Sequence, residues 1–592
     1  VLWVEERLKA VKHNRWARGI CQSGAPEKTP LYYANITGRN QIIGVSDTGL
    51  DMSSGYFWDP LVPPPYNTVN DTHRKVVTYI TTNGDKTDDD KEAHGTHVCG
   101  TAAGKSYRDY GDYKAYNGAA YDSKIAFFDM SRTSTSGALQ PPNDIDTQLL
   151  KRLHDAGARI ISNSWGNSNS AGSNAYTGDA RRVDAFMHRE KETLVIFSAG
   201  NEGARGDYSV SSPSTNKNGL CAGMSLNDHD NFLAYGWKTA ATVFQMNAVG
   251  FNSSRGPTAD DRLKPDLLAP GWFITSASGT SNPNTTLEDL HYQVKGLSGT
   301  SMSAPMLAGQ AALVREYFTS GFYPTGSKVS EDSLLPSGAL LKAMLIHSGQ
   351  PVANMVNKAG TVYSVGAYPS SLQGYGRVQI DKVLHFGWSR VSPISLFVVG
   401  SADASSSHYR ELSAVGQIHT YTVVTSATTS MLRVTLAYTD TVGTVGSANI
   451  LVNDLDVTLW PTSDPSTQHL PLLSNAHSRK NNVEQIILNN PAPNTNYTIE
   501  VRAHFIATVQ AYALVIIGDV KSYNDTETQG FGSGRSIGMS AVNQGVLAVL
   551  TIACTFLLLT VVCVSFFNRR PHDPDGESYS LNPGNSSPGV ES

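Results

Sequence analysis

The stretch GLSGTSMSAPMLAG, residues 296–309, places a serine in front of an apolar run and a proline shortly after it. A serine at such a place is usually a helix N-cap, because its hydroxyl accepts a backbone N–H of the first turn. The pattern predicts a helix that runs to about Phe318, with Pro305 in its first turn, where a missing N–H costs little. Ser301 then lies at the amino end, where the helix dipole favours negative charge. The segment alone leaves open whether Ser301 is a cap or a nucleophile.

Three further glycine-rich segments carry side chains that fit one reaction. Asp47 lies in GVSDTGLD (44–51), His94 opens HGTHVCGTAAG (94–104), and Asn201 lies in SAGNEG (198–203). Each has a plainer interpretation in isolation: a turn aspartate, one of two metal-binding histidines, and a turn asparagine. Cleavage of a peptide bond needs a nucleophile, a base, a group that orients the base and a donor for the oxyanion. Together with Ser301, these residues offer one candidate for each role.

Residues 40–350 alternate between short apolar runs and helical patterns. Residues 41–46, 124–130, 158–164 and 193–200 are apolar runs typical of buried strands, and residues 144–157 carry apolar side chains at helical spacing. Such alternation predicts an α/β fold with a parallel sheet and helices on both faces. Ligands bind at the carboxyl ends of the strands in such sheets, and Asp47, Ser164 and Gly200 all lie at predicted ends.

The composition changes after this α/β region. A break covers residues 392–408 and includes the linker-like stretch GSADASSSH (400–408). Residues 408–520 then contain one strand pattern after another, with Gly, Pro and Asn in the gaps, which predicts an all-β sandwich or jelly roll. We expect residues 521–544 to form a flexible stalk. The uncharged apolar run at 545–567 is long enough to cross a hydrocarbon core of about 30 Å as one transmembrane helix.

The flanks of the apolar run predict its orientation. Arg569 and Arg570 follow the run directly, whereas Arg535 is the only lysine or arginine in the 20 or so residues before it. The positive-inside rule therefore predicts a single-pass type I membrane protein, with residues 568–592 as a disordered cytoplasmic tail. The ectodomain would lie outside the cell or in the lumen of the secretory or endosomal system. Six glycosylation sequons on the outer side agree with this prediction: Asn35, Asn70, Asn252, Asn284, Asn496 and Asn524.

Charge and cysteine content argue against several classes of protein and of binding site. The formal net charge is −5 with a pI near 6.4, and no basic stripe stands out, which argues against nucleic acid as a partner. No C-x-x-C pair occurs, so neither a zinc ribbon nor a dithiol site is supported. Cys21, Cys99 and Cys221 lie outside the apolar run, and an odd number excludes a disulfide framework. We expect Cys99 to be a small buried side chain; a thiol whose modification disturbs His94 is the alternative.

The four segments, in the order Asp, His, Asn, Ser, resemble the subtilisin-like serine protease family, whose chain order differs from those of chymotrypsin and the α/β-hydrolases. SNSWG (162–166) resembles the family's substrate-binding strand, and SSRGPTADDRLKPDLLAPG (253–271) resembles a further family block. The resemblance implies a three-layer catalytic domain at 31–392, preceded at 1–30 by the end of a pro-segment. NILVNDLDVTLW (449–460) resembles the C-terminal jelly-roll domain of a large-subtilase subgroup.

The resemblance implies a role for each catalytic candidate. Ser301 is the nucleophile, and His94 is the general base and later the general acid. Asp47 orients His94 and supports its positive charge. Asn201 forms the oxyanion hole together with the backbone N–H of Ser301. We expect His97 to be structural, packed within its helix.

The same resemblance implies the residues that bind substrate. Ser164, Trp165 and Gly166 pair with the substrate backbone as an added strand, and Ala199 and Gly200 help to line the P1 pocket. The substrates would be proteins or peptides.

No cofactor is required for this chemistry, and structural calcium is a separate hypothesis. Asn453, Asp454 and Asp456 form an oxygen-rich group of the kind that calcium prefers. A second acidic group, residues 88–90, is more simply interpreted as a solvated loop before His94.

Three functions compete. The main hypothesis is a membrane-anchored serine endopeptidase that acts outside the cytosol through an acyl-enzyme and is held in the lipid bilayer by residues 545–567. The second is a surface binding module with an inactive protease domain, which the intact catalytic set argues against. The third is a tripeptidyl-peptidase of the sedolisin type, which uses a Glu/Asp pair, and HGTH (94–97) argues against it. The sequence gives no indication of the oligomeric state.

Overall fold

The computed structural model describes residues 14–81, 93–108, 111–131, 139–167, 172–228, 245–279, 290–357, 360–387, 395–473 and 475–528. These residues belong to one compact unit, Val1–Gly530. The predicted membrane helix at 545–567, the tail at 568–592, the acidic group at 88–90 and the sequon at Asn284 lie outside the described residues. In the part that is described, no helix is both long and apolar enough to span a membrane.

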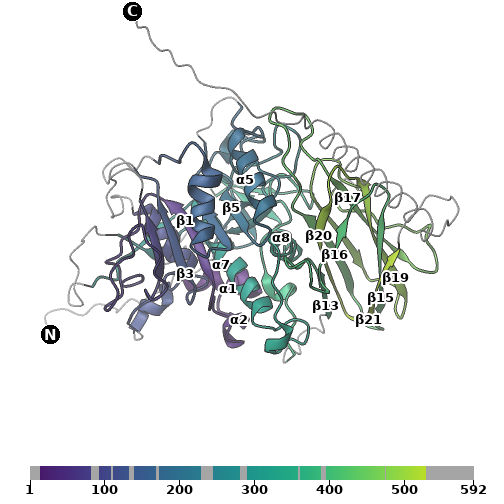
Figure 1. Cartoon of the computed structure of the whole chain (residues 1–592), viewed down its shortest axis with the longest axis horizontal. Helices are drawn as coiled ribbons and strands as arrows, with labels where there is room; N and C mark the ends of the chain where they lie inside the picture. Colours follow the sequence, from purple (N-terminus) through teal and green to yellow (C-terminus); the bar gives the residue numbers. More distant parts are fainter. Residues whose placement is uncertain are drawn as a thin grey trace, which may run out of the picture. The chain divides into compact units, whose positions relative to one another are not determined.

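A mixed sheet organises the first part of the chain, with ten strands among the described residues (Figure 1). Its order is β12-β11-β7-β6-β5-β4-β1-β3-β2, and β8 pairs with β6. The strands from β2 to β6 run parallel to one another, as predicted. The strands are β1 (Ile42–Asp47), β2 (Val76–Ile80), β3 (Lys124–Asp129), β4 (Ile160–Asn163), β5 (Leu194–Ser198), β6 (Leu220–Ser225), β7 (Ala248–Gly250), β8 (Leu267–Pro270), β11 (Asn354–Val356) and β12 (Val362–Ser364).

The sheet departs from the purely parallel prediction beyond β6. There β7 is antiparallel to β6, and β11 and β12 form an antiparallel pair. These strands are three residues long, and β11 and β12 are joined by a short loop, which suits an antiparallel pair.

The main helices are α1 (Asn14–Ser23), α2 (Pro30–Tyr33), α3 (His94–Ala103), α4 (Lys151–Asp155), α5 (Gly178–Arg189), α7 (Thr300–Thr319) and α8 (Gly338–His347). The helix predicted at 144–157 is divided, because a π-helical turn at Asp146–Leu150 precedes α4. The helix predicted from Ser301 to about Phe318 is α7, and Figure 1 shows it against the central strands, several of which it contacts.

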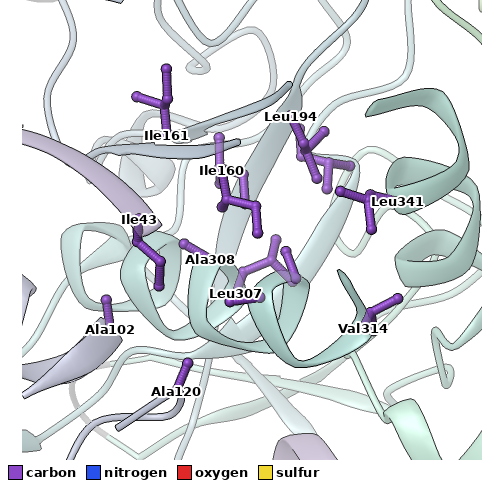
Figure 2. Packing of buried hydrophobic residues seen from close by; sticks show 14 of the residues in the cluster. Ile43, Ala102, Ala120, Ile160, Ile161, Leu194, Leu307, Ala308, Val314 and Leu341 are labelled. Atoms are coloured by element: carbon purple, nitrogen blue, oxygen red, sulfur yellow. The ribbon is translucent and has the colours of Figure 1, made fainter. Parts of the chain in front are cut away.

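Helices cover both faces of the sheet, as the apolar strands predict. Along β4, Ile160 points toward Leu307 of α7, whereas Ile161 points to the opposite side (Figure 2). A Cβ added to Gly44 of β1 would lie 3.2 Å from both Ile161 and Leu153 of α4, which places α4 on that second face. Side chains alternate in this way because successive residues of a strand face opposite sides.

The second part of the chain consists of two antiparallel sheets that enclose a separate apolar cluster. Buried side chains from both sheets meet in it, among them Tyr421, Leu436 and Leu459. This arrangement is the predicted β-sandwich. One sheet contains β13 (Ser395–Val399), β14 (Glu411–Leu412), β16 (Met431–Tyr438), β18 (Val483–Asn489) and β20 (Gln510–Gly518); the other contains β15 (Ile418–Thr425), β17 (Asp454–Pro461), β19 (Asn496–Phe505) and β21 (Val520–Thr528).

Both predicted limits of the sandwich are corrected by the structure. β13 lies inside the predicted break at 392–408 and pairs with β20. β21 occupies the first residues of the predicted stalk and pairs with β15. The sequence conceals β21 because it is an edge strand with polar residues along most of its length, and Val520 and Tyr523 supply its contacts with the core.

The sandwich is packed directly on the α/β part. Ala437 of β16 and Val515 of β20 belong to the same buried cluster as Leu341 of α8. Lys217 and Asp440 form an ion pair between these parts, and both side chains are 0% exposed. The stretch 400–408 is therefore a turn within a continuous interface, not a spacer between independent domains.

Candidate active site

Asp47 and His94 form the first contact of the predicted catalytic set. Asp47 is the last residue of β1, and His94 is the first residue of α3. His94 Nδ1 lies 2.7 Å from Asp47 Oδ1, which also accepts the backbone N–H of Thr48 at 2.8 Å. Asp47 is fully buried, whereas the His94 side chain is 25% exposed. A carboxylate on Nδ1 holds the proton on that nitrogen and leaves Nε2 available as a base.

A close backbone approach explains the glycine in HGTH. A Cβ on Gly95 would lie 2.0 Å from the carbonyl oxygen of Gly49, in the loop after β1. The N–H of Gly95 donates to Thr48 Oγ1 at 3.0 Å. Only glycine allows α3 to begin this close to β1, and this contact brings His94 to Asp47.

Ser301 is the second residue of α7, and Pro305 is the sixth, so the proline lies one turn later than predicted. Proline lacks the N–H that would bond to the carbonyl four residues earlier, which belongs to Ser301. The Ser164 hydroxyl donates to that carbonyl at 2.8 Å instead. The Ser301 hydroxyl in turn donates to the carbonyl of Ser164 at 3.3 Å. These two bonds join the start of α7 to the segment that follows β4.

The orientation of the Asn201 amide follows from its partners. Asn201 Oδ1 accepts the backbone N–H of Thr300 at 2.9 Å and the Thr300 hydroxyl at 3.1 Å. The amide oxygen is thereby held against α7, and the Nδ2 group is left to donate elsewhere. Asn201 is exposed and lines the same cleft as Ser301. This geometry suits a donor for an oxyanion that forms at Ser301.

Most predicted substrate-binding residues share this cleft, which is open and has a volume of about 560 Å³. Its walls include Ser164, Trp165, Gly166, Gly200, Asn201 and Ser301. A cleft of this size accommodates several residues of an extended peptide. The Trp165 side chain is held by two contacts with the sheet. Its Nε1 donates to Ser46 Oγ at 2.9 Å, and its ring lies edge-on to that of Phe197.

Ala199 lies elsewhere. It is fully buried in a small apolar cluster with Val210 and Cys221, beneath the backbone of Gly200. It is not one of the residues that form the walls of the cleft.

Two residues that the sequence analysis did not single out shape the site. Thr300 holds Asn201 and also accepts the N–H of Gly200 on its hydroxyl at 3.2 Å. The Ser254 hydroxyl accepts the N–H of Glu202 at 3.0 Å, and the N–H of Ser254 donates to the carbonyl of Gly200 at 3.0 Å. Both residues lie inside quoted motifs, but their roles depend on contacts between segments far apart in the chain.

His97 and Cys99 of α3 are both fully buried, as expected. His97 Nε2 lies 2.9 Å from the carbonyl oxygen of Ile274 and 3.0 Å from that of Lys295, so it fastens α3 to the hairpin of β9 (Ile274–Ala277) and β10 (Val294–Leu297). Burial lowers the pKa of His97 to about 3. The ring is therefore neutral and acts as a structural donor. Cys21, Cys99 and Cys221, the cysteines of the described residues, are buried and form no disulfide there.

The predicted calcium residues are engaged by protein groups. Asn453 Oδ1 accepts the N–H of Ala507 at 2.8 Å, so its oxygen faces a loop. Arg479 Nη1 lies 2.8 Å from Asp454 Oδ2 and 2.7 Å from Asp456 Oδ1. A guanidinium thus occupies the position between the two carboxylates where a cation would bind.

A neighbouring cluster of three side chains contains residue types that commonly bind metals. Atoms of Asp456, His477 and Glu484 lie within 4.8 Å of one another. Glu484 accepts the N–H of Val457 at 2.8 Å, and His477 Nδ1 lies 3.3 Å from Glu484 Oε2. The hydrogen bond to Glu484 raises the pKa of His477. These contacts join the three side chains in one ionic network.

The sequons differ in exposure. Asn35, Asn496 and Asn524 are exposed, and Asn70 is partly exposed. Asn252 is partly buried, and its carbonyl accepts the N–H of Gly203 at 3.0 Å.

Comparison with known proteins agrees with this geometry. Residues 38–376 match the model of the Subtilase family. The chain is 29% identical to the serine protease/ABC transporter B family protein tagB of Dictyostelium discoideum, over 79% of this chain and 29% of that protein. It is 31% identical to tagD of the same organism, over 72% of this chain and 28% of that protein. The chain thus spans less than a third of the length of these two relatives.

Two other similarities are more distant. Serine protease AprX of Bacillus subtilis is 26% identical over 47% of this chain and 58% of its own length. The CspB protease of Clostridium perfringens aligns in structure with a TM-score of 0.42 at 16% identity, over 59% of this chain and 93% of that chain. The family match covers more than half of the 592 residues and contains Asp47, His94, Asn201 and Ser301. The chain therefore belongs to the subtilase family of serine proteases.

Proposed function

We propose that this chain is a membrane-anchored serine endopeptidase that hydrolyses proteins or peptides through an Asp47–His94–Ser301 triad. The observation that carries the proposal is the 2.7 Å contact between the buried carboxylate of Asp47 and Nδ1 of His94. Family membership supports the same chemistry. A sedolisin-type site would place a carboxylic acid where His94 lies.

In the first step, His94 Nε2 removes the proton of Ser301 as the oxygen attacks the substrate carbonyl carbon. The Ser301 hydroxyl donates to the carbonyl of Ser164 in the free protein, so it must turn away from that acceptor before it reacts. Catalytic hydrogen bonds often become aligned only when substrate is bound. Asp47 stabilises the imidazolium that forms, and burial away from water strengthens this interaction.

The oxyanion receives hydrogen bonds from Asn201 Nδ2 and from the backbone N–H of Ser301. The bonds from Thr300 to Asn201 Oδ1 support this role, because they orient the amide before substrate arrives. His94 then gives its proton to the leaving amine, and an ester remains on Ser301. Water, deprotonated by His94, hydrolyses this acyl-enzyme and regenerates the hydroxyl.

Substrate would lie along residues 164–166 as an added strand, with its P1 side chain near Gly200. The open cleft between Gly166 and Asn201 supports an extended polypeptide as the substrate. The cleft wall also contains Glu202 and Arg205, which pair with each other at 3.0 Å and leave no strong single charge at the rim.

The membrane part of the proposal rests on sequence. Residues 545–567 are apolar and uncharged, and Arg569 and Arg570 follow them. The ectodomain would then lie outside the cytosol. Deletion of residues 545–567 should move the protein from the membrane pellet to the supernatant in carbonate extraction. Retention of the deletion variant in the pellet would contradict the anchor.

Labelling with a fluorophosphonate tests the catalytic proposal. The purified chain in detergent micelles is treated with the probe, and the modified peptide is identified by mass spectrometry. We expect an adduct on Ser301 that is lost in His94→Ala, with labelling that rises with pH as the base loses its proton. A folded protein, free of any pro-segment, that takes no label would instead support the binding module.

A further inference from the structure

A second cavity, of about 320 Å³, lies away from the catalytic cleft. Arg74 and Lys75 come directly before β2, and Tyr121 and Asp122 come just before β3, so the cavity lies at the amino ends of these strands. Asp47 pairs with the last residue of β3. Because β3 has six residues, about 16 Å of strand separates the cavity from the catalytic end of the sheet.

Arg74 enters this cavity without a carboxylate partner among the described residues. Its guanidinium donates to three carbonyl oxygens: that of Trp58 at 2.9 Å, that of Lys105 at 3.0 Å and that of Gly55 at 3.4 Å. It also lies 5.7 Å from the centre of the Tyr107 ring. The carbonyls fix the position of the guanidinium. The nearest carboxylate, that of Asp59, accepts the backbone N–H of Arg74 at 2.6 Å and acts on the guanidinium only through its charge.

Lys75 lines the same cavity and is 1% exposed. Its ammonium donates to the carbonyl of Tyr121 at 2.9 Å and to that of Ser123. No carboxylate of the described residues pairs with it. Burial holds the pKa of Lys75 well below its usual value, and the charges of Arg74 and Lys105 lower it further. Burial thus favours the neutral amine of Lys75, and an anion bound in the cavity would stabilise the protonated form.

Asp122 is the one carboxylate among the residues of the cavity wall, and it has several partners. Lys105 Nζ lies 2.5 Å from Asp122 Oδ1. The Thr37 hydroxyl donates to Asp122 Oδ2 at 2.6 Å, and Arg39 Nε lies 3.5 Å from the same oxygen. Two carboxylates, Asp122 in the wall and Asp59 beside Arg74, thus lie near three basic side chains of the wall, Arg74, Lys75 and Lys105.

We infer that this cavity binds a tetrahedral oxyanion, a phosphate or sulfate group, either free or carried as an ester. Arg74 is held by carbonyls in a fixed orientation, which suits the oxygens of such a group. The phenolic groups of Tyr107 and Tyr121 also line the cavity, and neither has a hydrogen-bond partner among the described residues. They supply neutral donors beside the cations. The site is independent of proteolysis.

Titration calorimetry of the full chain in detergent tests the inference. Sodium phosphate and sodium sulfate are compared with sodium chloride at equal ionic strength and pH 7. We expect saturable binding of one oxyanion per chain and none of chloride. Lys105→Gln should weaken binding at least tenfold, which is about 1.4 kcal/mol. Asp122→Asn should tighten it, because the competing carboxylate is removed.

Lys328→Gln is the matched control, because Lys328 is an exposed lysine outside the cavity. It should bind like the wild type. Lys105 is 43% exposed, so its replacement should leave the fold intact, and circular dichroism checks this. If Lys105→Gln and Lys328→Gln change the affinity for the oxyanion equally, the proposed site is wrong.

Two further probes distinguish the source of the group: a phosphorylated monosaccharide, and phosphatidylcholine vesicles that contain phosphatidic acid. Lys105-dependent binding of any probe supports the inference, and the probe that binds tightest identifies whether the anion is free, on a glycan or on a lipid. Failure of all probes, with Ser301 still labelled by fluorophosphonate, overturns the anion site and leaves the proposed protease unaffected.

Discussion

Replacement of Thr300 by valine tests whether this residue prepares the oxyanion hole. Valine keeps the size and branching of threonine but removes the hydroxyl. That hydroxyl donates to Asn201 Oδ1 at 3.1 Å and accepts the N–H of Gly200 at 3.2 Å. Asn201 retains its bond from the backbone N–H of residue 300, so its amide is loosened rather than released.

The expected loss follows from these bonds. Each neutral hydrogen bond contributes about 1 kcal/mol, so two contribute about 2 kcal/mol. If both bonds act in full on the transition state, their loss lowers kcat by about 30-fold. Loss of the contribution of one bond lowers kcat by about 5-fold. Asn201→Ala removes the donor itself and should cost roughly 10² to 10³ in kcat, a range that was measured on a subtilisin. Thr300→Val should therefore fall between the wild type and Asn201→Ala.

The assay measures kcat on a fluorescent unfolded protein substrate, normalised to active sites titrated with fluorophosphonate. Thr435→Val is the matched control. Thr435 is also fully buried, and its hydroxyl has two partners, His347 Nδ1 at 2.9 Å and Gln485 Nε2 at 3.0 Å, in the sandwich interface. It should lower the melting temperature without a change in kcat. The reasoning is refuted if Thr300→Val keeps kcat within about twofold, or if Thr435→Val lowers kcat equally.

Three other predictions concern stability and assembly. Lys217→Met strands the buried charge of Asp440 and should cost about 3–5 kcal/mol in urea unfolding, with recovery when Asp440→Leu is added; no recovery would contradict the ion-pair argument. Glu484 raises the pKa of His477, so His477→Gln should lose stability below pH 6.5, and the difference should shrink as pH rises through the folded-state pKa; a pH-independent difference would contradict it. Gly95→Ala should abolish fluorophosphonate labelling while circular dichroism is retained, because its Cβ would lie 2.0 Å from a carbonyl oxygen; full labelling would contradict it.

The sequence alone predicted the central sheet well, because its information is local. The apolar runs at 41–46, 124–130, 158–164 and 193–200 correspond to β1, β3, β4 and β5 within a few residues. Buried parallel strands are recognisable because both faces must be apolar. The edge strand β21 was missed, since its polar residues resemble those of a stalk and its pairing with β15 bridges about a hundred residues of sequence.

The proposed catalytic set was also recognisable in the sequence, because the motifs carry chemistry in their residue types. The structure brings Asp47 and His94 into contact and places Ser301 and Asn201 in one cleft. Their supporting partners were not predictable. Thr300 is an ordinary residue of the motif until its hydrogen bonds to Asn201 are known, and these depend on how α7 meets the turn after β5.

The sequence by itself thus determined the strand and helix pattern and the chemical identity of the site, since both depend on residue type and local spacing. Only the tertiary structure decided which polar groups are already occupied. Asp454 and Asp456 resemble calcium ligands in sequence, but Arg479 lies between them. Lys75 resembles an ordinary surface cation in sequence, but the fold buries it beside a cavity whose wall holds three basic side chains and one carboxylate. The physical reason is that charge compensation depends on distance in space, which residues far apart in the chain acquire only on folding.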